Sequence, residues 1–325
     1  MNVKFEPVTT IFIGSGEEYY PNDYVALEDE LGFIDNNLLL DEVIRNNKYE
    51  EFLKVSDDIE KLMDFIYDFG EEIGYEKICK TFIKGDEKVL EELSDSTSRK
   101  VYAFIKDKYY FTPIIPGSSI KGAIRTAILS YLAKKFDIPK VRTGKDLEAH
   151  FFCNNERFDA KKDMLKALFV SDFKPKKYKL KVMRPVNRPY KKNRDNPIPV
   201  VIEALIEGEF VGEIRIDENL LNNDPNLRNN PYFKDEKFDI SLIKKSLREF
   251  FKEIAKIENN RFKANNVKYE DYLIKIGKLA GAGSKSISEH RKIKIRQINK
   301  IFDYQLSVWL DVEQNPFGWG KLTFI

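Results

Sequence analysis

The sequence contains little cysteine and little histidine, which limits the metal and redox chemistry that it can support. Cys79 and Cys153 are the only cysteines among 325 residues, and they are too far apart to form a CxxC pair. His150 lies shortly before Cys153, but a zinc site needs about two further ligands that this segment does not offer. We therefore expect a packed histidine, a buried cysteine, no disulfide framework, and neither a metal ion nor another cofactor.

Long apolar runs are also missing. The first residues, MNVKFEPVTTIFIG, lack the apolar core of a secretory signal, and no segment approaches the roughly 20 apolar residues of a membrane span. We expect a cytoplasmic protein without membrane contact. The hydrophobic content of 42% and the aromatic content of 13% are those of a chain that folds around a core.

Acidic residues are absent from two stretches, and charge is divided unevenly along the chain. No Asp or Glu occurs between Asp107 and Asp137 or within residues 174–194. Residues 1–100 contain 11 Lys and Arg against 25 Asp and Glu, whereas residues 101–325 contain 44 against 28, so the first part carries −14 and the rest +16. This division is typical of a nucleic-acid-binding protein whose acidic part points away from the phosphates or toward a basic protein.

The segment from Phe111 to Phe136 has the clearest helix pattern in the sequence. Pro116 and Gly117 form a turn, and Ser118 is a suitable N-cap. Apolar residues then recur at the spacing of one helix face, at Ile120, Ile124, Ala127, Ile128, Tyr131 and Leu132. We expect a helix over 118–136 with one side packed into a core.

The first two turns of this helix contain residues that disfavour a helix. Lys121 and Arg125 lie near the positive end of the helix dipole and repel each other by roughly 0.2–0.5 kcal/mol. Gly122 costs about 1 kcal/mol relative to alanine. One interpretation is an anion site, with serine hydroxyls, two cations and a glycine that permits close approach. The other is that the cations are solvated and Gly122 packs against a strand, and the residues alone leave both open.

The most basic segment runs from Lys174 to Arg194, where ten Lys and Arg occur without an acidic residue. Three prolines exclude a helix, so we expect an extended hairpin or a flexible loop over about 174–197. Tyr178 and Tyr190 lie among the cations, a composition typical of loops that stack on bases and neutralise phosphates. Ten uncompensated charges favour an anionic partner over a solvated loop.

The remaining patterns predict an α+β fold. Strands are expected at 3–13, ending at Gly14, at 100–115, at 167–173, as a pair over 199–217 with its turn at Glu207 and Gly208, and at 272–280. A second amphipathic helix is expected at 242–257. Together with the helix at 118–136, this is the β-α-β-β-α-β order of a ferredoxin-like or RRM-like unit with long insertions. We divide the chain into residues 1–217 and 218–325, the second part being a C-terminal lobe with a helix, a glycine-rich loop and closing strands.

Two segments lie outside this core order. A short hairpin over 24–34 precedes an acidic insertion of about 38–98, whose apolar residues are three and four apart as in helices. The insertion is a surface that avoids RNA or docks a partner, or it is simply a solvated acidic face. Residues 276–286, IGKLAGAGSKS, form a glycine-rich turn that is not a Walker A loop, because Lys285 follows Ser284 instead of preceding it.

Several of these motifs resemble a known family. PGSSIKGAIRTAI, which begins at Pro116, is similar to the signature of the RAMP superfamily, the RRM-like RNA-binding subunits of CRISPR effector complexes. In that signature, Pro-Gly-Ser-Ser-x-Lys-Gly-x-x-Arg opens the first helix, and residues 116–125 fill all of its positions. IGSG at 13–16 is a weaker match. VSDF at 170–173, Glu203 in a strand pair and the ending PFGWGKL resemble subunits of type III-A (Csm) complexes.

The resemblance implies an RRM-like core with a helical insertion and a basic hairpin loop. It also implies a non-catalytic subunit that caps the complex at the crRNA 3′ end and supports crRNA maturation. The implied partners are crRNA, other Csm subunits, above all the repeated backbone RAMP subunit, and also target RNA and cellular nucleases. The residues expected to bind RNA are Ser118, Ser119, Lys121, Arg125, Lys181, Arg184, Arg188, Lys191, Lys192, Arg194, Gly281, Gly283, Ser284 and Lys285.

The alternative within the same family is an endoribonuclease that processes CRISPR precursor RNA. Such enzymes usually use a histidine as general base, and this chain has only His150 and His290. A single aspartate that cleaves RNA with a metal ion is the other catalytic option, and Asp23 and Asp35 are the nearest candidates to the first strand. The sequence identifies a partner for neither.

Overall fold

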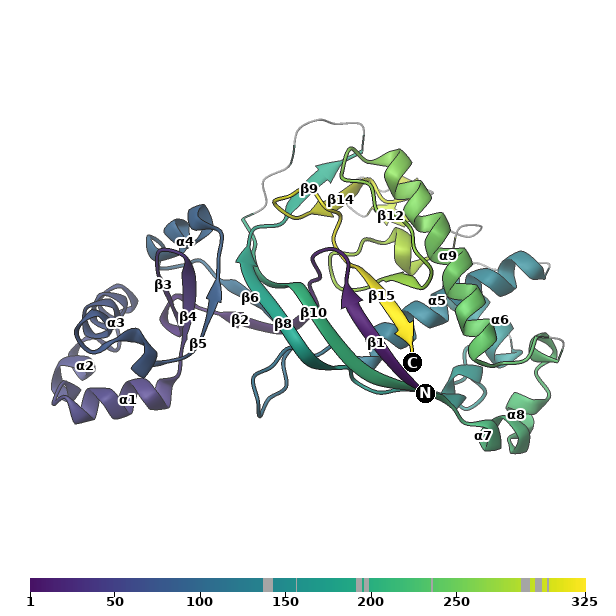
Figure 1. The fold of residues 1–325 in the computed structure, drawn as a ribbon, viewed down its shortest axis with the longest axis horizontal. Coiled ribbons are helices and arrows are strands. Elements are labelled where there is room, and N and C mark those ends of the chain that lie inside the picture. Colours follow the sequence, from purple (N-terminus) through teal and green to yellow (C-terminus); the bar gives the residue numbers. More distant parts are fainter. Residues whose placement is uncertain are drawn as a thin grey trace.

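An eight-stranded sheet runs through the main body of the molecule (Figure 1). The structure is a computed structural model that describes residues 1–136, 143–155, 157–190, 195, 199–234, 236–287, 293–295, 300–302 and 304–325. The strands of this sheet are β1 (Asn2–Pro7), β2 (Gly14–Tyr19), β6 (Val101–Phe104), β7 (Leu168–Val170), β8 (Lys174–Met183), β10 (Val201–Ile216), β11 (Leu273–Lys275) and β15 (Trp319–Phe324). They follow the order β11-β15-β1-β10-β6-β2, and β7 and β8 also pair with β10.

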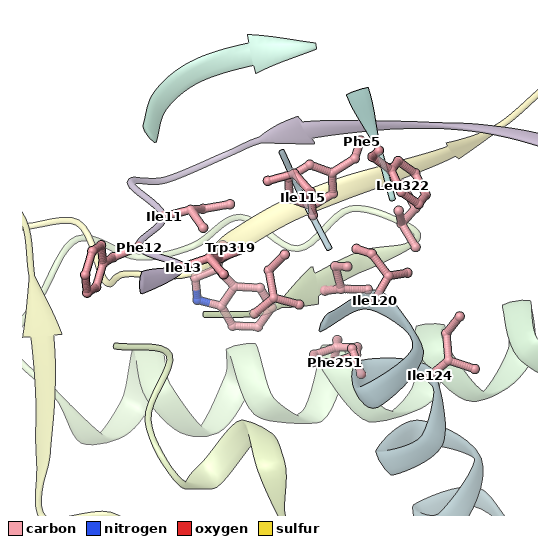
Figure 2. Close-up of a cluster of buried hydrophobic side chains, with 14 of the residues drawn as sticks. Phe5, Ile11, Phe12, Ile13, Ile115, Ile120, Ile124, Phe251, Trp319 and Leu322 are labelled. Carbon is pink, nitrogen blue, oxygen red and sulfur yellow. The ribbon is translucent and has the colours of Figure 1, made fainter. Parts of the chain in front are cut away.

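Two long helices, α5 (Gly117–Lys135) and α9 (Ile240–Arg261), pack together to form the main core with this sheet. Figure 2 shows Ile120 and Ile124 of α5 and Phe251 of α9 lying close to Phe5, Trp319 and Leu322 of the strands. Shorter helices extend the main body: α6 (Gly144–Cys153), α7 (Glu218–Asn223) and α8 (Pro225–Arg228). Because α5 and β1 share their core with α9 and β15, residues from both ends of the chain build one folding unit.

The acidic insertion forms a small lobe that lies apart from the main sheet, at the left of Figure 1. It combines a three-stranded antiparallel sheet with helices: β3 (Tyr24–Ala26), β4 (Glu30–Ile34), α1 (Asn36–Arg45), α2 (Tyr49–Val55), α3 (Ile59–Ile73), β5 (Cys79–Lys84) and α4 (Glu87–Ser94). The hairpin expected over 24–34 is present as β3 and β4. Part of the lobe has its own hydrophobic cluster, which includes Val43, Phe65 and Phe69, whereas residues such as Phe33 and Leu90 belong to the main core.

Short strands cover the end of the sheet that lies near the C-terminus of α9. β9 (Val186–Pro189) pairs with β14 (Ser307–Leu310), and β12 (Ile293–Ile295) pairs with β13 (Lys300–Phe302). Phe262, Tyr304, Val308 and Leu310 form a third hydrophobic cluster there.

The structure corrects several of the expected strands. The first strand ends at Pro7 instead of reaching 13, and residues 14–16 lie inside β2 instead of breaking a strand. Residues 201–216 form one continuous strand instead of two strands joined by a turn. The pairing of this strand with β8 shifts register between Leu205 and Glu207 and again between Glu209 and Phe210, so bulges replace the expected turn. β11 has only three residues and pairs with β15, so the C-terminal strand takes the place beside β1.

The observed architecture is the expected α+β type. The segments β1, α5, β8, β10, α9 and β15 follow one another in the β-α-β-β-α-β order, and β15, β1, β10 and β8 lie next to one another in the sheet. α5 begins and ends within one residue of the prediction, and α9 includes the whole of 242–257. Among the described residues, no helix has the length and apolar character that would let it cross a membrane.

Candidate functional site

A cleft of about 550 Å³ lies where the start of α5 meets the glycine-rich loop and the start of β2. Three sequence-distant segments supply its described lining: Ile13 and Gly14; Ser118, Ser119, Gly122, Ala123, Arg125 and Thr126; and Lys275, Ile276, Gly277, Lys278, Ser284 and Lys285. Four of these residues are cationic, and none of the described lining residues is acidic. The fold therefore brings the helix start and the glycine-rich loop together, as the motifs suggested.

The N-terminus of α5 is held tightly against β7. A Cβ atom on Gly117 would lie 2.2 Å from the carbonyl oxygen of Val170, so only glycine fits there. The Gly117 N–H donates to Asp172 Oδ1 at 2.8 Å. Asp172 thus supplies negative charge at the positive end of the helix dipole, and the first amide of the helix is not open to another anion. Ser118 and Ser119 remain on the cleft wall, with Ser118 exposed.

Lys121 and Arg125 are engaged within the protein. Lys121 Nζ donates to the carbonyl oxygen of Leu168 at 2.6 Å, and burial lowers the pKa of this lysine. Arg125 forms ion pairs with Glu148, at 3.1 Å, and with Asp163, and only 22% of its side chain is exposed. The carboxylates that compensate Arg125 come from α6 and from the segment before β7. Arg125 is a structural cation at the edge of the cleft.

Replacing Arg125 with alanine is expected to destabilise the protein more than it changes contacts to a ligand. The substitution leaves Asp163, whose side chain is 10% exposed, without its cation, and we expect a loss of about 2 kcal/mol in the free energy of unfolding. Urea unfolding followed by tryptophan fluorescence measures this change. Arg125→Lys keeps the charge but cannot reach both carboxylates through two guanidinium nitrogens, so it should lose less free energy of unfolding than the alanine variant. An unchanged unfolding midpoint for the alanine variant would show that the ion pairs contribute nothing.

The glycine-rich loop uses its polar groups to hold its own shape. The Gly283 N–H donates to Gln305 Oε1 at 2.8 Å, and Ser284 Oγ donates to the carbonyl oxygens of Ala280 and Gly281. Gly281 adopts a φ of +83°, and a Cβ there would meet Gln305. Gly283 and Ser284 are buried. These three residues therefore shape the loop, and Lys285 is one of its residues that present a cation at the surface.

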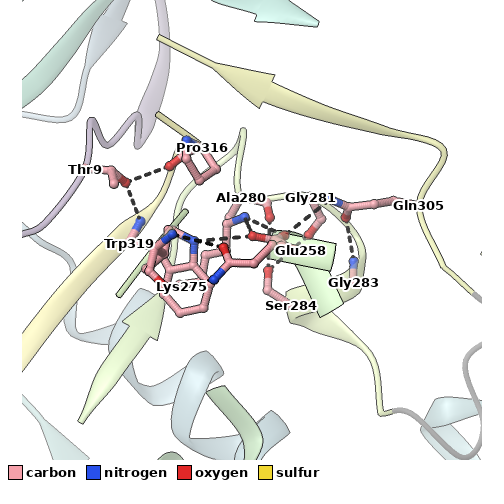
Figure 3. A network of polar contacts seen from close by, with 12 residues as sticks. Thr9, Glu258, Lys275, Ala280, Gly281, Gly283, Ser284, Gln305, Pro316 and Trp319 are labelled. Carbon is pink, nitrogen blue, oxygen red and sulfur yellow. Dashed lines mark hydrogen bonds and ion pairs between the residues drawn. The ribbon is translucent and has the colours of Figure 1, made fainter. Parts of the chain in front are cut away.

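A buried ion pair anchors this loop from below (Figure 3). Lys275 Nζ lies 2.6 Å and 2.5 Å from the two carboxylate oxygens of Glu258, and both residues are almost fully buried. Trp319 Nε1 donates to Glu258 at 3.3 Å, and Tyr304 and Gln305 approach the same carboxylate at 3.5 Å. Burial lowers the pKa of Lys275, while Glu258 opposes the shift. The pair joins α9, β11 and β15 beneath the cleft.

Lys278 and Lys285 are the exposed cations of the cleft. Lys285 Nζ donates to the carbonyl oxygen of Gly277 at 2.9 Å, which fixes its position without neutralising its charge. Gly277 has a φ of +98° and passes so close to Phe12 that a Cβ would lie 2.5 Å from its carbonyl oxygen. Sequence reasoning missed Lys278. The feature that could have identified Lys278 is its position directly after Gly277, where the backbone conformation requires a glycine.

The basic segment is partly compensated by acids, two of which are distant in sequence. Lys181 pairs with Asp86, Arg184 with Glu92, and Arg188 with Asp195. The expectation of ten uncompensated charges is therefore wrong, because the fold places acids of the helical lobe and of the following loop beside these cations. Lys174, Lys176 and Lys177 are exposed on β8, and Tyr178 is 45% exposed. Lys191, Lys192 and Arg194 lie outside the described residues.

The catalytic alternatives have structural roles where the structure describes them. His150 Nε2 contacts the Tyr232 hydroxyl at 2.5 Å, and burial lowers the pKa of this histidine. Asp23 accepts the backbone N–H of Tyr20, and Asp35 is the N-cap of α1. His290 lies outside the described residues. No group of three or more His, Cys, Asp or Glu side chains suited to a metal ion occurs in the part of the chain that the structure describes.

Comparisons with known proteins agree with one another. A family model described as the RAMP superfamily matches residues 4–286. The "CRISPR system Cms protein Csm5" of Methanocaldococcus jannaschii is 30% identical over 285 residues, which cover 83% of this chain. The chain spans 65% of the length of that relative.

Two solved structures share the fold. One chain of a cryo-EM structure of a Csm–crRNA–target RNA ternary complex from a type III-A CRISPR-Cas system has a TM-score of 0.72 and 21% identity, and the match covers 99% of this chain and 100% of that chain. The crystal structure of T. onnurineus Csm5 has a TM-score of 0.68 and 19% identity, with 98% and 99% coverage.

Proposed function

The chain belongs to the RAMP superfamily, and from this premise we propose that it is a non-catalytic RNA-binding subunit of a type III-A CRISPR (Csm) effector ribonucleoprotein. In this proposal it corresponds to Csm5, caps the backbone of the complex at the crRNA 3′ end, supports crRNA maturation in antiviral defence and acts in the cytoplasm. Its partners are crRNA, the repeated backbone RAMP subunit, other Csm subunits, target RNA and cellular nucleases. The relative and the two solved structures support this assignment.

The acid-free cleft beside α5 is the observation that carries the proposal. Its described lining combines serine hydroxyls with two exposed residues that are cationic, Lys278 and Lys285, and these groups suit a phosphodiester backbone. Gly122 faces open space, since a Cβ there would meet no atom within 4 Å, so a strand can approach the helix closely. Ser118, Ser119, Lys278 and Lys285 are the residues that we propose to contact RNA.

The other residues of the expected site have supporting roles in this proposal. Lys121 and Arg125 fix the first turns of α5, while Gly281, Gly283 and Ser284 shape the loop. Lys181, Arg184 and Arg188 join the basic segment to the helical lobe and to the C-terminal segment. The exposed lysines of β8 add positive charge along that strand.

Replacing Lys278 and Lys285 together with alanine is expected to weaken binding of single-stranded RNA and to flatten its salt dependence. Each lost phosphate contact on a single strand lowers the slope of log K against log salt by about 0.7, so the pair should lower it by about 1.4. Fluorescence anisotropy over a series of salt concentrations measures both quantities. The unfolding midpoint should stay near that of the wild type, because both side chains are exposed.

A matched control removes the same charge from the acidic lobe. Lys54 and Lys77 are exposed there, and Lys54→Ala with Lys77→Ala should leave both affinity and slope unchanged. An equal loss in the two double variants would mean that net charge alone drives binding, against the cleft. The same samples, incubated with CRISPR repeat RNA and run on a denaturing gel, should contain intact RNA. Specific cleavage by the purified chain would favour the endoribonuclease alternative.

A further inference from the structure

A tight turn between β6 and α5 presents two consecutive tyrosines to solvent. Tyr109 is 93% exposed and Tyr110 is 79% exposed, more than any other exposed large hydrophobic residue of the described chain, of which Ile325 comes next at 69%. The loop that contains them projects from the lower edge of the main body in Figure 1. Sequence patterns predicted a strand running through 115, but β6 ends at Phe104. Two aromatic rings in water are unfavourable unless a partner covers them.

The turn has a defined backbone that holds both rings outward. The Asp107 N–H donates to the Thr112 carbonyl oxygen at 2.8 Å, and the Phe111 N–H donates to the Asp107 carbonyl oxygen at 2.9 Å. Asp107 Oδ1 accepts the backbone N–H groups of Tyr109 and Tyr110 at 2.9 Å and 3.0 Å. These bonds lower the pKa of Asp107. The tyrosines are thus preorganised, which reduces the entropy lost when a ligand binds.

Cations surround the base and the tip of the turn. Lys80 Nζ and Lys106 Nζ lie 4.1 Å and 4.3 Å from the centre of the Phe111 ring. Lys108 precedes the two tyrosines in sequence, and the charge of Lys174 on β8 reaches Asp107. Lys106 is neutralised by the buried Glu203, so it anchors the turn, while Lys80, Lys108 and Lys174 are charges at or near the surface.

The turn rises from the rim of the proposed RNA cleft. The Ile105 N–H donates to the carbonyl oxygen of Ile13 at 2.8 Å, and Ile13 and Gly14 line the cleft. On its other side, the chain leads from the turn through Pro116 directly to Ser118 and Ser119 on the cleft wall. At about 3.3 Å per residue, the arm from Pro113 to Tyr110 reaches about 10 Å from its base. The arm that carries the two rings therefore begins at the wall of the cleft.

We propose that Tyr109 and Tyr110 form a base-stacking platform for single-stranded RNA whose backbone lies in the cleft, an inference that rests on the proposed RNA-binding function. The rings supply planar surfaces for unpaired bases, and the nearby lysines accommodate the phosphates between them. The centre of a docking site for a protein is depleted in charged residues. This tip consists instead of a lysine and two separate rings above a cationic base.

The test compares Tyr109→Ala/Tyr110→Ala with Tyr109→Phe/Tyr110→Phe in the full chain. The probe is a single-stranded RNA of mixed sequence that contains 2-aminopurine, whose fluorescence is quenched by stacking on aromatic rings. The alanine variant should bind this RNA about tenfold or more weakly, and it should lose part of the quenching. The phenylalanine variant should keep both, because stacking needs the rings and not the hydroxyls. The salt slope should stay that of the wild type, since no phosphate contact is removed.

The outcomes separate this inference from the proposed function. Wild-type affinity and quenching in the alanine variant would overturn the stacking platform, and weakened binding in Lys278→Ala/Lys285→Ala would then leave the RNA-binding function intact. Absence of RNA binding by the wild-type chain would overturn both. Thermal unfolding of each variant serves as the folding control, and no change is expected because the rings are exposed.

Discussion

Replacing Glu258 with alanine is expected to lower the free energy of unfolding by about 3–5 kcal/mol. The substitution leaves the buried ammonium of Lys275 without a counter-charge and the Trp319 indole N–H without its acceptor. Because Tyr304 and Gln305 also approach this carboxylate, the loop above the pair should lose order as well. Urea unfolding measures the loss, and hydrogen exchange at Gly283 measures the order of the loop.

A double substitution shows whether the loss of stability in Glu258→Ala comes from the missing charge partner or from the missing side-chain volume. Glu258→Leu with Lys275→Met replaces the pair by apolar side chains of similar size, so it should be clearly more stable than Glu258→Ala alone. RNA binding should recover in the same order as stability, since the cleft depends on the loop that the pair supports. A free energy of unfolding of Glu258→Ala within about 1 kcal/mol of the wild-type value would contradict the assigned role of the pair.

Replacing Glu203 with alanine is the second change expected to cost about 3–5 kcal/mol. Glu203 is fully buried on β10, where it accepts the backbone N–H of Phe104 at 3.1 Å and pairs with Lys106 at 2.5 Å. Burial raises the pKa of Glu203 and lowers that of Lys106, although their mutual attraction opposes both shifts. Removing the carboxylate leaves two buried donors without an acceptor. Urea unfolding gives the magnitude of the effect.

The same change should reach the tyrosine turn, because Lys106 stands at its base beside Phe111. Hydrogen exchange at the amides of Asp107 and Phe111 is expected to accelerate in Glu203→Ala. Glu203→Leu with Lys106→Met is the matched apolar control and should restore part of the stability, but not the contact between the Lys106 ammonium and the Phe111 ring. Unchanged exchange in the single variant would show that the turn is held independently of the buried pair.

Local patterns predicted the central helix correctly because its signals lie within a few residues of one another. The apolar spacing from Ile120 to Leu132 and the Pro-Gly turn before Ser118 specify a helix whatever the chain does elsewhere. The sheet was predicted less well. β10 is a single long strand instead of two because it pairs with β8 along the whole length of β8, with register shifts at two places. The place of β15 beside β1 joins the two ends of the chain, which no local pattern encodes.

The candidate site shows the same division. The family signature pointed to the right region, since Ser118, Ser119 and Lys285 line one cleft. It did not separate cations that are exposed from those that are compensated. Arg125 looked uncompensated because its partners, Glu148 and Asp163, lie in segments that follow the helix. Arg184 looked uncompensated because its partner, Glu92, belongs to the inserted lobe.

The main helices, the α+β order, the uneven charge and the motif that opens α5 follow from the order of residues alone, since each depends on residues that are close together in the chain. Which lysines and arginines have a carboxylate beside them, which strand lies next to β1, and which aromatic rings remain in water depend on the folded chain. Ion pairing and burial are set by distances in space, and a few ångströms decide whether a charge is compensated or available to a phosphate.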